Sequence, residues 1–370
     1  LGDTLFRQAM RGVQQQQAET TLSAEGFRDA LEAATGADLH PFFADQVFKP
    51  GFSVFVPGAS SRTPEGNGVR INMDIVQRLR GTDEYHTQVP LEITCISADQ
   101  DTSIHRVVVG GASTPVSFVA PFDPAMVVLN RNSKLNQARM HHERVLVPGV
   151  SFPTLQSRTD FNLFQNNLVD STFIRVEHVW SGPEASQLHP DVEAISTTHY
   201  WRVDGIWPEG TSLRARVGYT GSQAYMLDHD LYGVTELNAA ILYRERPEEP
   251  WTVYPDQVVS LNSLTNGIGF INMNPLRKGE YAFGKGIIPV GVEEAVSGAA
   301  RFGLQPVPTN GPLWVVPEAD APRIGEVRIF ASDGRCVMDR RVDQQEGGIP
   351  LDVSALPVGA YVLHATATDG

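Results

Sequence analysis

The sequence predicts a multidomain, mainly β protein in which a short N-terminal α-helical segment is followed by antiparallel β-sandwich domains. Apolar residues recur with a helical period only in residues 1–51, whereas from residue 52 onward they alternate with polar residues in short runs. Glycine, proline, asparagine and aspartate separate these runs, as is typical of antiparallel sandwiches rather than of alternating strands and helices.

The composition limits the classes of protein to which the chain can belong. Its 370 residues allow roughly two to four domains. The formal net charge of −14 argues against a nucleic acid or an anionic lipid surface as partner. No apolar run approaches the roughly 20 residues of a membrane span. Cys95 and Cys336 fall in different expected domains, which favours two buried thiols over the alternative of a disulfide.

The first 51 residues follow a helical pattern. Ser23 is expected to cap a helix that ends at Gly36, and a third short helix is expected around residues 40–48. We expect the apolar face of this segment to dock on the first sandwich or to mediate dimerisation, because a large exposed apolar patch is unusual on a monomer. The first helix has its apolar stripe at Leu5, Phe6, Ala9, Met10 and Val13.

Three β units are expected after the helical segment. Residues 134–144 are either a helix or an extended arm that leaves the first of them. In the third unit, Asp333-Gly334 predicts a hairpin turn, since glycine tolerates a positive φ. The expected units are residues 52–150, 151–286 and 302–370, with linkers at 148–153 and 289–303.

The sequence contains no zinc motif of the His-Glu-x-x-His type. Its one His-Glu pair, His142-Glu143, is followed by Leu146 where the second histidine would stand. The tripeptide at 228–230, Asp-His-Asp, supplies too few ligands for Ca²⁺, so a solvated turn is expected there, with a loop metal site as the alternative. We interpret His141 and His142 as a surface pair. The chain is therefore predicted to hold no catalytic residue and no metal ligand.

The second β unit is rich in aromatic residues, among them Trp201 and Trp207. Tryptophan and tyrosine commonly fill sandwich cores, so a core position is the expectation for both. The alternative is a ligand-binding role in which Trp201 and Trp207 stack on a glycan or a peptide.

Several short motifs follow one another in residues 1–130. They are Gly2-Asp3-x-x-Phe6-Arg7, Glu25-x-Phe27, Leu31-Glu32-x-x-Thr35-Gly36-x-Asp38-Leu39-x-x-Phe42-Phe43, Pro50-Gly51, Val89-Pro90-Leu91-Glu92-Ile93 and Pro121-Phe122-x-x-Ala125-x-Val127-Val128-Leu129-Asn130. In these motifs the chain resembles the aminopeptidase N family, the gluzincin zinc metallopeptidases. Two positions differ: the family usually has tryptophan where Val47 stands and proline where Ser53 stands.

This resemblance implies a parent protein that removes N-terminal residues from peptides with one zinc ion. The ion and its glutamate base would lie upstream of Leu1, so this chain would hold no cofactor itself. Residues 1–51 would be the helical end of the catalytic domain, which is the implied partner, and residues 52–150 would be the sandwich that braces it.

Residues 302–370 carry three further motifs. They are Pro306-x-Pro308-x-x-Gly311, Asp333-Gly334-Arg335 and Leu356-Pro357-x-Gly359-x-Tyr361. They are similar to the type IX secretion sorting domain that ends many surface proteins of gliding or oral Gram-negative bacteria. This resemblance implies an immunoglobulin-like sandwich, the type IX secretion machinery as a partner, and a secreted or cell-surface location.

The two resemblances together predict the non-catalytic C-terminal region of a secreted zinc aminopeptidase-like protein. The alternative hypothesis is a non-enzymatic cell-surface scaffold with a decayed peptidase domain. Its β domains would bind a glycan or another surface protein.

Overall fold

The computed structural model describes most of the chain and confirms a mainly β protein. Strands make up 49% of it and helices 12%. The chain divides into two compact units, residues 1–289 and 290–370. No helix among the described residues is long and apolar enough to span a membrane. The described residues are 2–150, 159–261, 263–287, 302–305, 311–317, 323–331, 334–342 and 348–367, so half of the expected linker at 148–153 and most of the one at 289–303 lie outside them.

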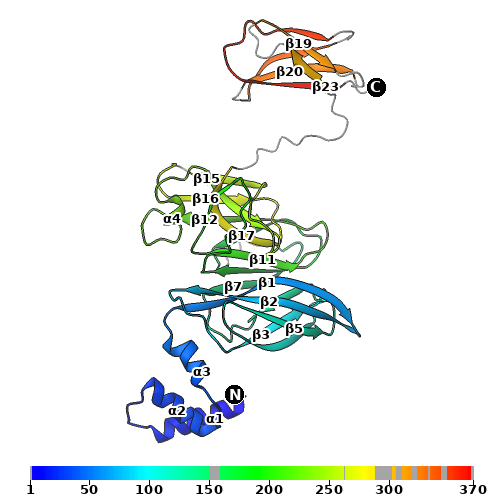
Figure 1. Cartoon of the computed structure of the whole chain (residues 1–370). Helices are drawn as coiled ribbons and strands as arrows, with labels where there is room; N and C mark the ends of the chain where they lie inside the picture. The colour runs from blue at the N-terminus through cyan, green and yellow to red at the C-terminus, as the bar shows by residue number, and fades with distance from the viewer. Residues whose placement is uncertain are drawn as a thin grey trace. The chain divides into compact units, whose positions relative to one another are not determined.

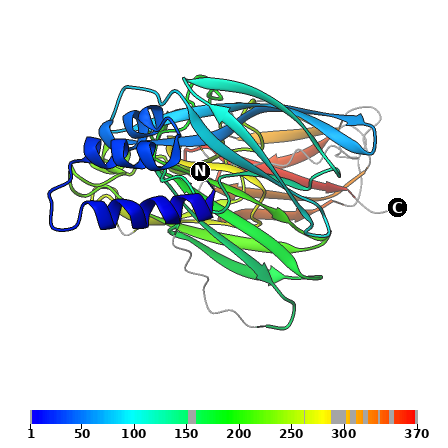
Figure 2. The same ribbon diagram turned by 90° about the horizontal axis from the view of Figure 1, so that it is seen from below.

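The helical segment opens the first unit. Helices α1 (Asp3–Gln16) and α2 (Ala24–Thr35) lie side by side, as Figure 2 shows. The Ser23 hydroxyl accepts a hydrogen bond from the Gly26 N–H at 3.1 Å, and Gly36 ends α2 at a φ of 70°. Both predicted caps are therefore confirmed. Two short helices follow, α3 (His40–Phe43) and the π-helical η1 (Ala44–Phe48).

A first β-sandwich follows the helices. Its two antiparallel sheets have the strand orders β1-β2-β5 and β4-β3-β6. Residues of both sheets, from Phe55 to Leu129, form one buried core. The strands are β1 (Phe52–Glu65), β2 (Gly68–Arg80), β3 (Val89–Ile96), β4 (Thr102–Val109), β5 (Ser113–Ala120) and β6 (Met126–Leu129).

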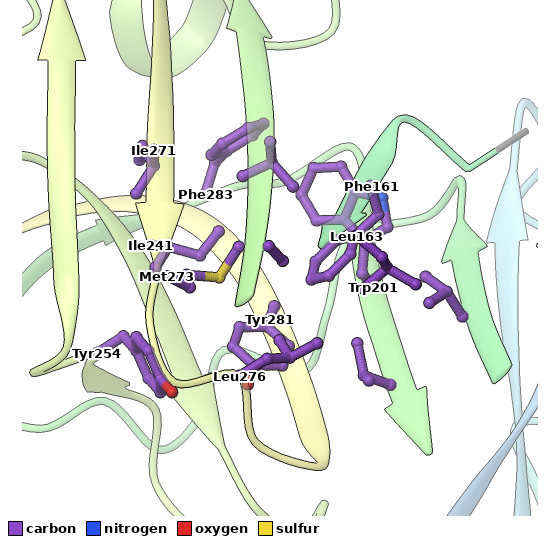
Figure 3. Packing of buried hydrophobic residues seen from close by; sticks show 14 of the residues in the cluster. Phe161, Leu163, Trp201, Ile241, Tyr254, Ile271, Met273, Leu276, Tyr281 and Phe283 are labelled. Atoms are coloured by element: carbon purple, nitrogen blue, oxygen red, sulfur yellow. The ribbon is translucent and has the colours of Figure 1, made fainter. Parts of the chain in front are cut away.

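A second β-sandwich packs a seven-stranded sheet against a four-stranded sheet. The strand orders are β14-β13-β17-β11-β9-β7, with β10 beside β17, and β15-β16-β12-β8. Figure 3 shows their shared core, which includes Trp201, Tyr281 and Phe283. The strands are β7 (Arg139–Leu146), β8 (Phe161–Asn167), β9 (Thr172–Val179), β10 (Val192–Ile195), β11 (Tyr200–Ile206), β12 (Ser212–Thr220), β13 (Ala239–Arg244), β14 (Thr252–Val253), β15 (Gln257–Leu261), β16 (Ile268–Met273) and β17 (Gly279–Gly286), and α4 (His229–Tyr232) follows β12.

Strand β7 joins the two sandwiches. It is the extended form of the arm predicted at 134–144, and it pairs with β9 in antiparallel register from Arg139↔Val179 to Leu146↔Thr172. We expected the first β unit to end at residue 150. The sheet of the second sandwich, however, includes β7, which lies before that residue.

The seven-stranded sheet is buried on both faces. One face contributes to the core of Figure 3. The opposite face packs against β1 and β2 of the first sandwich, where Val54, Val56 and Val76 contact Tyr200, Leu242 and Trp251. The layers are visible in Figure 1, in which β1 and β2 lie next to β7 and β11.

Charged residues cross this buried face from strand to strand. Glu177 on β9 accepts hydrogen bonds from Arg139 on β7 at 3.0 Å and from Arg175 at 2.8 Å, and it lies 3.4 Å from Arg202 on β11. Arg202 also contacts Glu280 on β17 at 3.1 Å, and Glu280 contacts Arg244 on β13 at 2.7 Å.

This row, which we call the charge ladder, keeps the carboxylate of Glu177 ionised. Burial alone would raise the pKa of Glu177, but the nearby charges of Arg139, Arg175 and Arg202 outweigh burial and hold that pKa well below its usual value. The pairs that Glu177 forms are therefore ionic, and two of its three partners, Arg139 and Arg202, lie on the neighbouring strands β7 and β11.

The second unit is a smaller sandwich, described by itself. Its sheets have the orders β18-β19-β22 and β21-β20-β23, around a core that includes Val315, Val327 and Leu351. Gly334, in the hairpin between β20 and β21, has the expected positive φ of 80°, whereas Asp333 lies outside the described residues. The strands are β18 (Phe302–Gln305), β19 (Pro312–Pro317), β20 (Ile324–Ala331), β21 (Cys336–Arg341), β22 (Ile349–Asp352) and β23 (Tyr361–Ala367).

The two cysteines are both free thiols. Cys95 is buried in the first sandwich, as predicted, and burial raises its pKa to about 11. Cys336 is exposed, so the prediction of a buried thiol is wrong at that position. It lies on β21, where only part of the strand contributes to the core.

Replacing Glu177 by alanine should strongly destabilise the first unit. The substitution leaves the guanidinium groups of Arg139, Arg175 and Arg202 buried without their shared carboxylate. Loss of one partner of a buried ion pair costs about 3–5 kcal/mol of unfolding free energy. Urea denaturation followed by tryptophan fluorescence measures this loss.

The matched control is Glu65→Ala, which removes the ion pair with Arg70 at the surface of the β1–β2 hairpin. Solvated pairs contribute little to stability, so this variant should unfold at nearly the urea concentration of the parent protein. Equal midpoints for the two variants would show that the charge ladder does not stabilise the fold.

Candidate functional site

The two tryptophans predicted from the sequence lie in or beside the core of the second sandwich. Trp201 is 1% exposed, and its indole N–H donates to the Thr159 carbonyl at 2.7 Å. Trp207 is half-buried against the same core, with the Lys278 amine 5.7 Å from its ring centre. The core position expected for Trp201 is confirmed, so it cannot offer an open face to a ligand. Sequence reasoning missed the polar groups that surround it.

Three buried side chains form a hydrogen-bonded chain beside Trp201. The His178 Nε2 lies 2.7 Å from the His199 Nδ1, and the His199 Nε2 lies 2.8 Å from an Asp228 carboxylate oxygen. The indole N–H of Trp180 donates to the His178 Nδ1 at 3.1 Å. We call His178, His199 and Asp228, together with the donor Trp180, the His–His–Asp chain.

The hydrogen-bond partners fix the tautomer of each ring. An indole nitrogen only donates, so the Nδ1 of His178 accepts and its Nε2 carries the proton. That proton is donated to the Nδ1 of His199, whose own Nε2–H is donated to Asp228. The second carboxylate oxygen of Asp228 accepts the backbone N–H of Thr220 at 2.8 Å. Every ring nitrogen in the chain is therefore occupied.

Burial keeps the ring of His178 neutral. The pKa of His178 is lowered to about 2, first by burial and then by the neighbouring His199 and Arg80. Protonation of the Nδ1 would also break the hydrogen bond from Trp180. A ring with no free nitrogen and a low pKa can neither take a proton from a substrate near neutral pH nor bind a metal ion.

An open cavity of about 570 Å³ lies next to the His–His–Asp chain. His178, His199 and Trp201 form its floor. The rest of the lining comes from the ends of three strands of the four-stranded sheet and from the loop after β12: Asp160, Asn162, Gly218, Tyr219, Thr220, Leu227, Asp228, Ile268, Gly269 and Phe270.

Asp228 reaches the chain through its turn. It stands directly before α4, and its N–H donates to the Thr220 carbonyl at 3.3 Å, which folds the loop back on the end of β12. The solvated turn predicted at 228–230 is wrong at Asp228, which is only 5% exposed. His229 contacts the Gly221 carbonyl and Asp230 accepts from Thr197, so the three side chains do not converge on a metal.

The described residues contain one other group with metal-ligand side chains, Asp29, Glu32 and His40. It lies on the surface of the helical segment, and one Glu32 oxygen already accepts from the Leu39 N–H at 2.6 Å and contacts His40 at 2.9 Å. The zinc ion implied for the parent protein does not fit this group, since it lacks the pair of histidines one turn apart. The surface position predicted for His141 and His142 differs from the structure, in which both side chains are half-buried on β7.

The helical segment docks on the first sandwich through polar groups rather than through the expected apolar face. Asp45, 4% exposed, accepts the backbone N–H groups of Thr87 at 2.7 Å and of Gln88 at 3.2 Å. Burial by itself raises the pKa of Asp45, but these bonds and the Lys49 amine outweigh burial and lower it. The carboxylate therefore fixes η1 to the sandwich.

This docking leaves an apolar surface uncovered, which we call the aromatic face. Its members are Phe42, Val47, Phe48 and Phe52, each between 42% and 48% exposed. Phe43 lies beneath and contacts the rings of Phe42 and Phe48 at centroid distances of 5.8 and 6.0 Å. The surface is thus held in place by its own small cluster.

Replacing His199 by alanine should lower the unfolding free energy of the first unit by about 2–4 kcal/mol, because a buried carboxylate and a buried imidazole lose their partner. The matched control is His189→Ala, whose side chain is 47% exposed and which should leave stability nearly unchanged. Urea denaturation of both variants measures the difference. A His199 variant as stable as the control would contradict a closed chain.

The ring of His178 should remain neutral down to about pH 4, whereas free histidine titrates near ~6.5. Because its folded-state pKa lies below the unfolded value, the unfolded chain binds the extra proton as the pH falls. The stability from this group is complete above about pH 6.5 and falls with acidification by up to about 1.4 kcal/mol per pH unit. Nitrogen-15 NMR of the ring checks this, and a titration near about pH 6 would contradict it.

The candidate site is therefore a neutral, fully bonded floor beside an open cavity, an arrangement suited to binding rather than to acid–base or metal chemistry. In comparisons with known proteins, no protein-family model, no curated protein and no solved structure matches the chain.

Proposed function

We propose that the chain is the non-catalytic C-terminal region of a secreted zinc aminopeptidase-like protein. Residues 1–51 complete the wall of the catalytic domain, the first sandwich braces that wall, and the last unit, an immunoglobulin-like sorting domain, directs export through the type IX secretion machinery. The peptide chemistry belongs to the parent protein, and its zinc ion lies outside this chain.

The aromatic face is the observation that carries this proposal. Three of its four side chains lie on the segment whose motifs resemble the end of an aminopeptidase catalytic domain, and one of them is Val47, where that family usually has tryptophan. Asp45 holds this segment against the first sandwich, so the exposed rings keep a fixed position. A fixed apolar surface of this kind favours a protein partner, and the catalytic domain is the partner that the resemblance supplies.

The decisive experiment is to read the coding region upstream of Leu1 and to express the protein with it. An encoded His-Glu-x-x-His motif and zinc-dependent aminopeptidase activity support the proposal. A broken motif favours the alternative, a cell-surface scaffold with a decayed peptidase domain. Zinc-dependent peptide hydrolysis by residues 1–370 alone would overturn the non-catalytic assignment.

The aromatic face should bind a hydrophobic fluorescent dye in the chain as it stands. The double variant Phe42→Ser, Phe48→Ser removes two of its exposed rings, so dye fluorescence should fall by half or more. Tyr225→Ser is the control, because Tyr225 is 83% exposed and lies in the second sandwich. The parent protein extended upstream should bind as little dye as the double variant. Strong dye binding by the extended protein would mean that the aromatic face has another partner.

A further inference from the structure

The cavity beside the His–His–Asp chain has a use that the proposed function does not require. Its volume of about 570 Å³ is typical of small-molecule sites, which span roughly 300–1,000 Å³. It lies between the end of the seven-stranded sheet and the four-stranded sheet. Its floor and its rim differ in chemistry, and together they define what could bind.

The floor offers no free hydrogen-bonding group. The ring nitrogens of His178 and His199 are occupied within the chain, and the indole N–H of Trp201 is donated to Thr159. The Tyr219 hydroxyl donates to Glu236. A ligand therefore finds no free donor or acceptor on these four side chains.

The wall presents one accessible aromatic ring. Phe270 on β16 is 45% exposed and lies directly opposite Gly218 on β12. A Cβ at Gly218 would stand only 3.2 Å from the ring, so the absence of a side chain there lets Phe270 lie across the strand. The Arg216 guanidinium, 5.0 Å from the ring centre, holds it from the side of the sheet. Phe270 is thus a fixed platform at the mouth of the cavity.

The rim supplies polar groups that the fold leaves free. The side chains of Asp160, Asn162 and Thr220 line the mouth, and none of them forms a hydrogen bond within the described residues. The Asp160 carboxylate lies 3.9 Å from the Nδ1 of His178, beyond hydrogen-bond distance. Together they provide a carboxylate, an amide and a hydroxyl next to the ring of Phe270.

The charge of the lining excludes some ligands. Asp160 and Asp228 both line the cavity, and no lysine or arginine among the described residues does so. The two lining carboxylates disfavour an anionic ligand, and the nearest cation that holds Phe270, Arg216, does not line the cavity. A quaternary ammonium is disfavoured as well, because an aromatic cage needs several open ring faces and Trp201 and Tyr219 are at most 1% exposed.

We propose that this cavity binds a neutral saccharide of one or two rings. The apolar face of one sugar ring lies on Phe270, and its hydroxyls donate to the Asp160 carboxylate and exchange hydrogen bonds with Asn162 and Thr220. A neutral polyol fits a rim of mixed donors and acceptors around a single flat ring better than an ion does. The proposal stands independently of the function of the helical segment.

The test is a titration of the full chain with neutral sugars. Glucose, galactose, mannose, N-acetylglucosamine and their common disaccharides are added at millimolar concentrations, and binding is followed by calorimetry and by tryptophan fluorescence. At least one sugar should bind saturably. Phe270→Ala and Asp160→Ala should each weaken its binding tenfold or more, and Phe270→Leu, which keeps an apolar side chain without the flat ring, should behave like Phe270→Ala.

Phe164→Ala is the matched control. Phe164 lies on the same sheet, under the Arg214 guanidinium at 4.4 Å, but does not line the cavity. Its variant should bind the sugar as the parent chain does. The proposal is overturned if no neutral sugar saturates, if choline binds in place of the sugars, or if the Phe270 and Phe164 variants lose affinity equally. Circular dichroism of each variant separates lost binding from lost folding.

Discussion

The burial of the seven-stranded sheet on both faces is the constraint on which the first unit depends. All eight residues of its strand β9 are buried. One side of that strand contributes Ile174, Val176 and His178 to the second sandwich, and the other side holds the charges of Arg175 and Glu177 against the first. Arg175 and Glu177 pair with each other on this strand, whereas Arg139 on β7 and Arg202 on β11 reach Glu177 only when the three strands stand in one register. The ladder thus sets the alignment that also brings His178 next to His199.

Alternation predicted the strands well because most of them have one face toward a core. It was less informative for β1, where the period of two selects Val54 and Val56 but passes over Phe55. The structure buries Phe55 in the first sandwich and the two valines against the second, so both faces of β1 are buried over residues 53–56. Pattern reasoning that assumes one wet face cannot distinguish an inter-sandwich contact from an ordinary core, and for the same reason it placed no charges inside.

The candidate site was only partly accessible from sequence. The alternation that places Trp201 and Val203 in the core extends back to His199, and that of Ile174 and Val176 extends to His178, so two inward-facing histidines could have been inferred. The contribution of Asp228 could not, because it depends on how the loop after β12 folds back. The helix caps at Ser23 and Gly36 were predictable because they depend only on the local backbone geometry at the ends of α2, and not on how a distant loop folds.

The direction of the hydrogen bonds beneath the cavity has a further consequence. Networks of imidazoles and hydroxyls commonly interconvert between two mirror arrangements of protons, and their dipoles average out. Here the indole of Trp180 can only donate and the carboxylate of Asp228 can only accept, so the sequence of donors cannot be inverted. The floor therefore has one permanent polarity, negative toward Asp228.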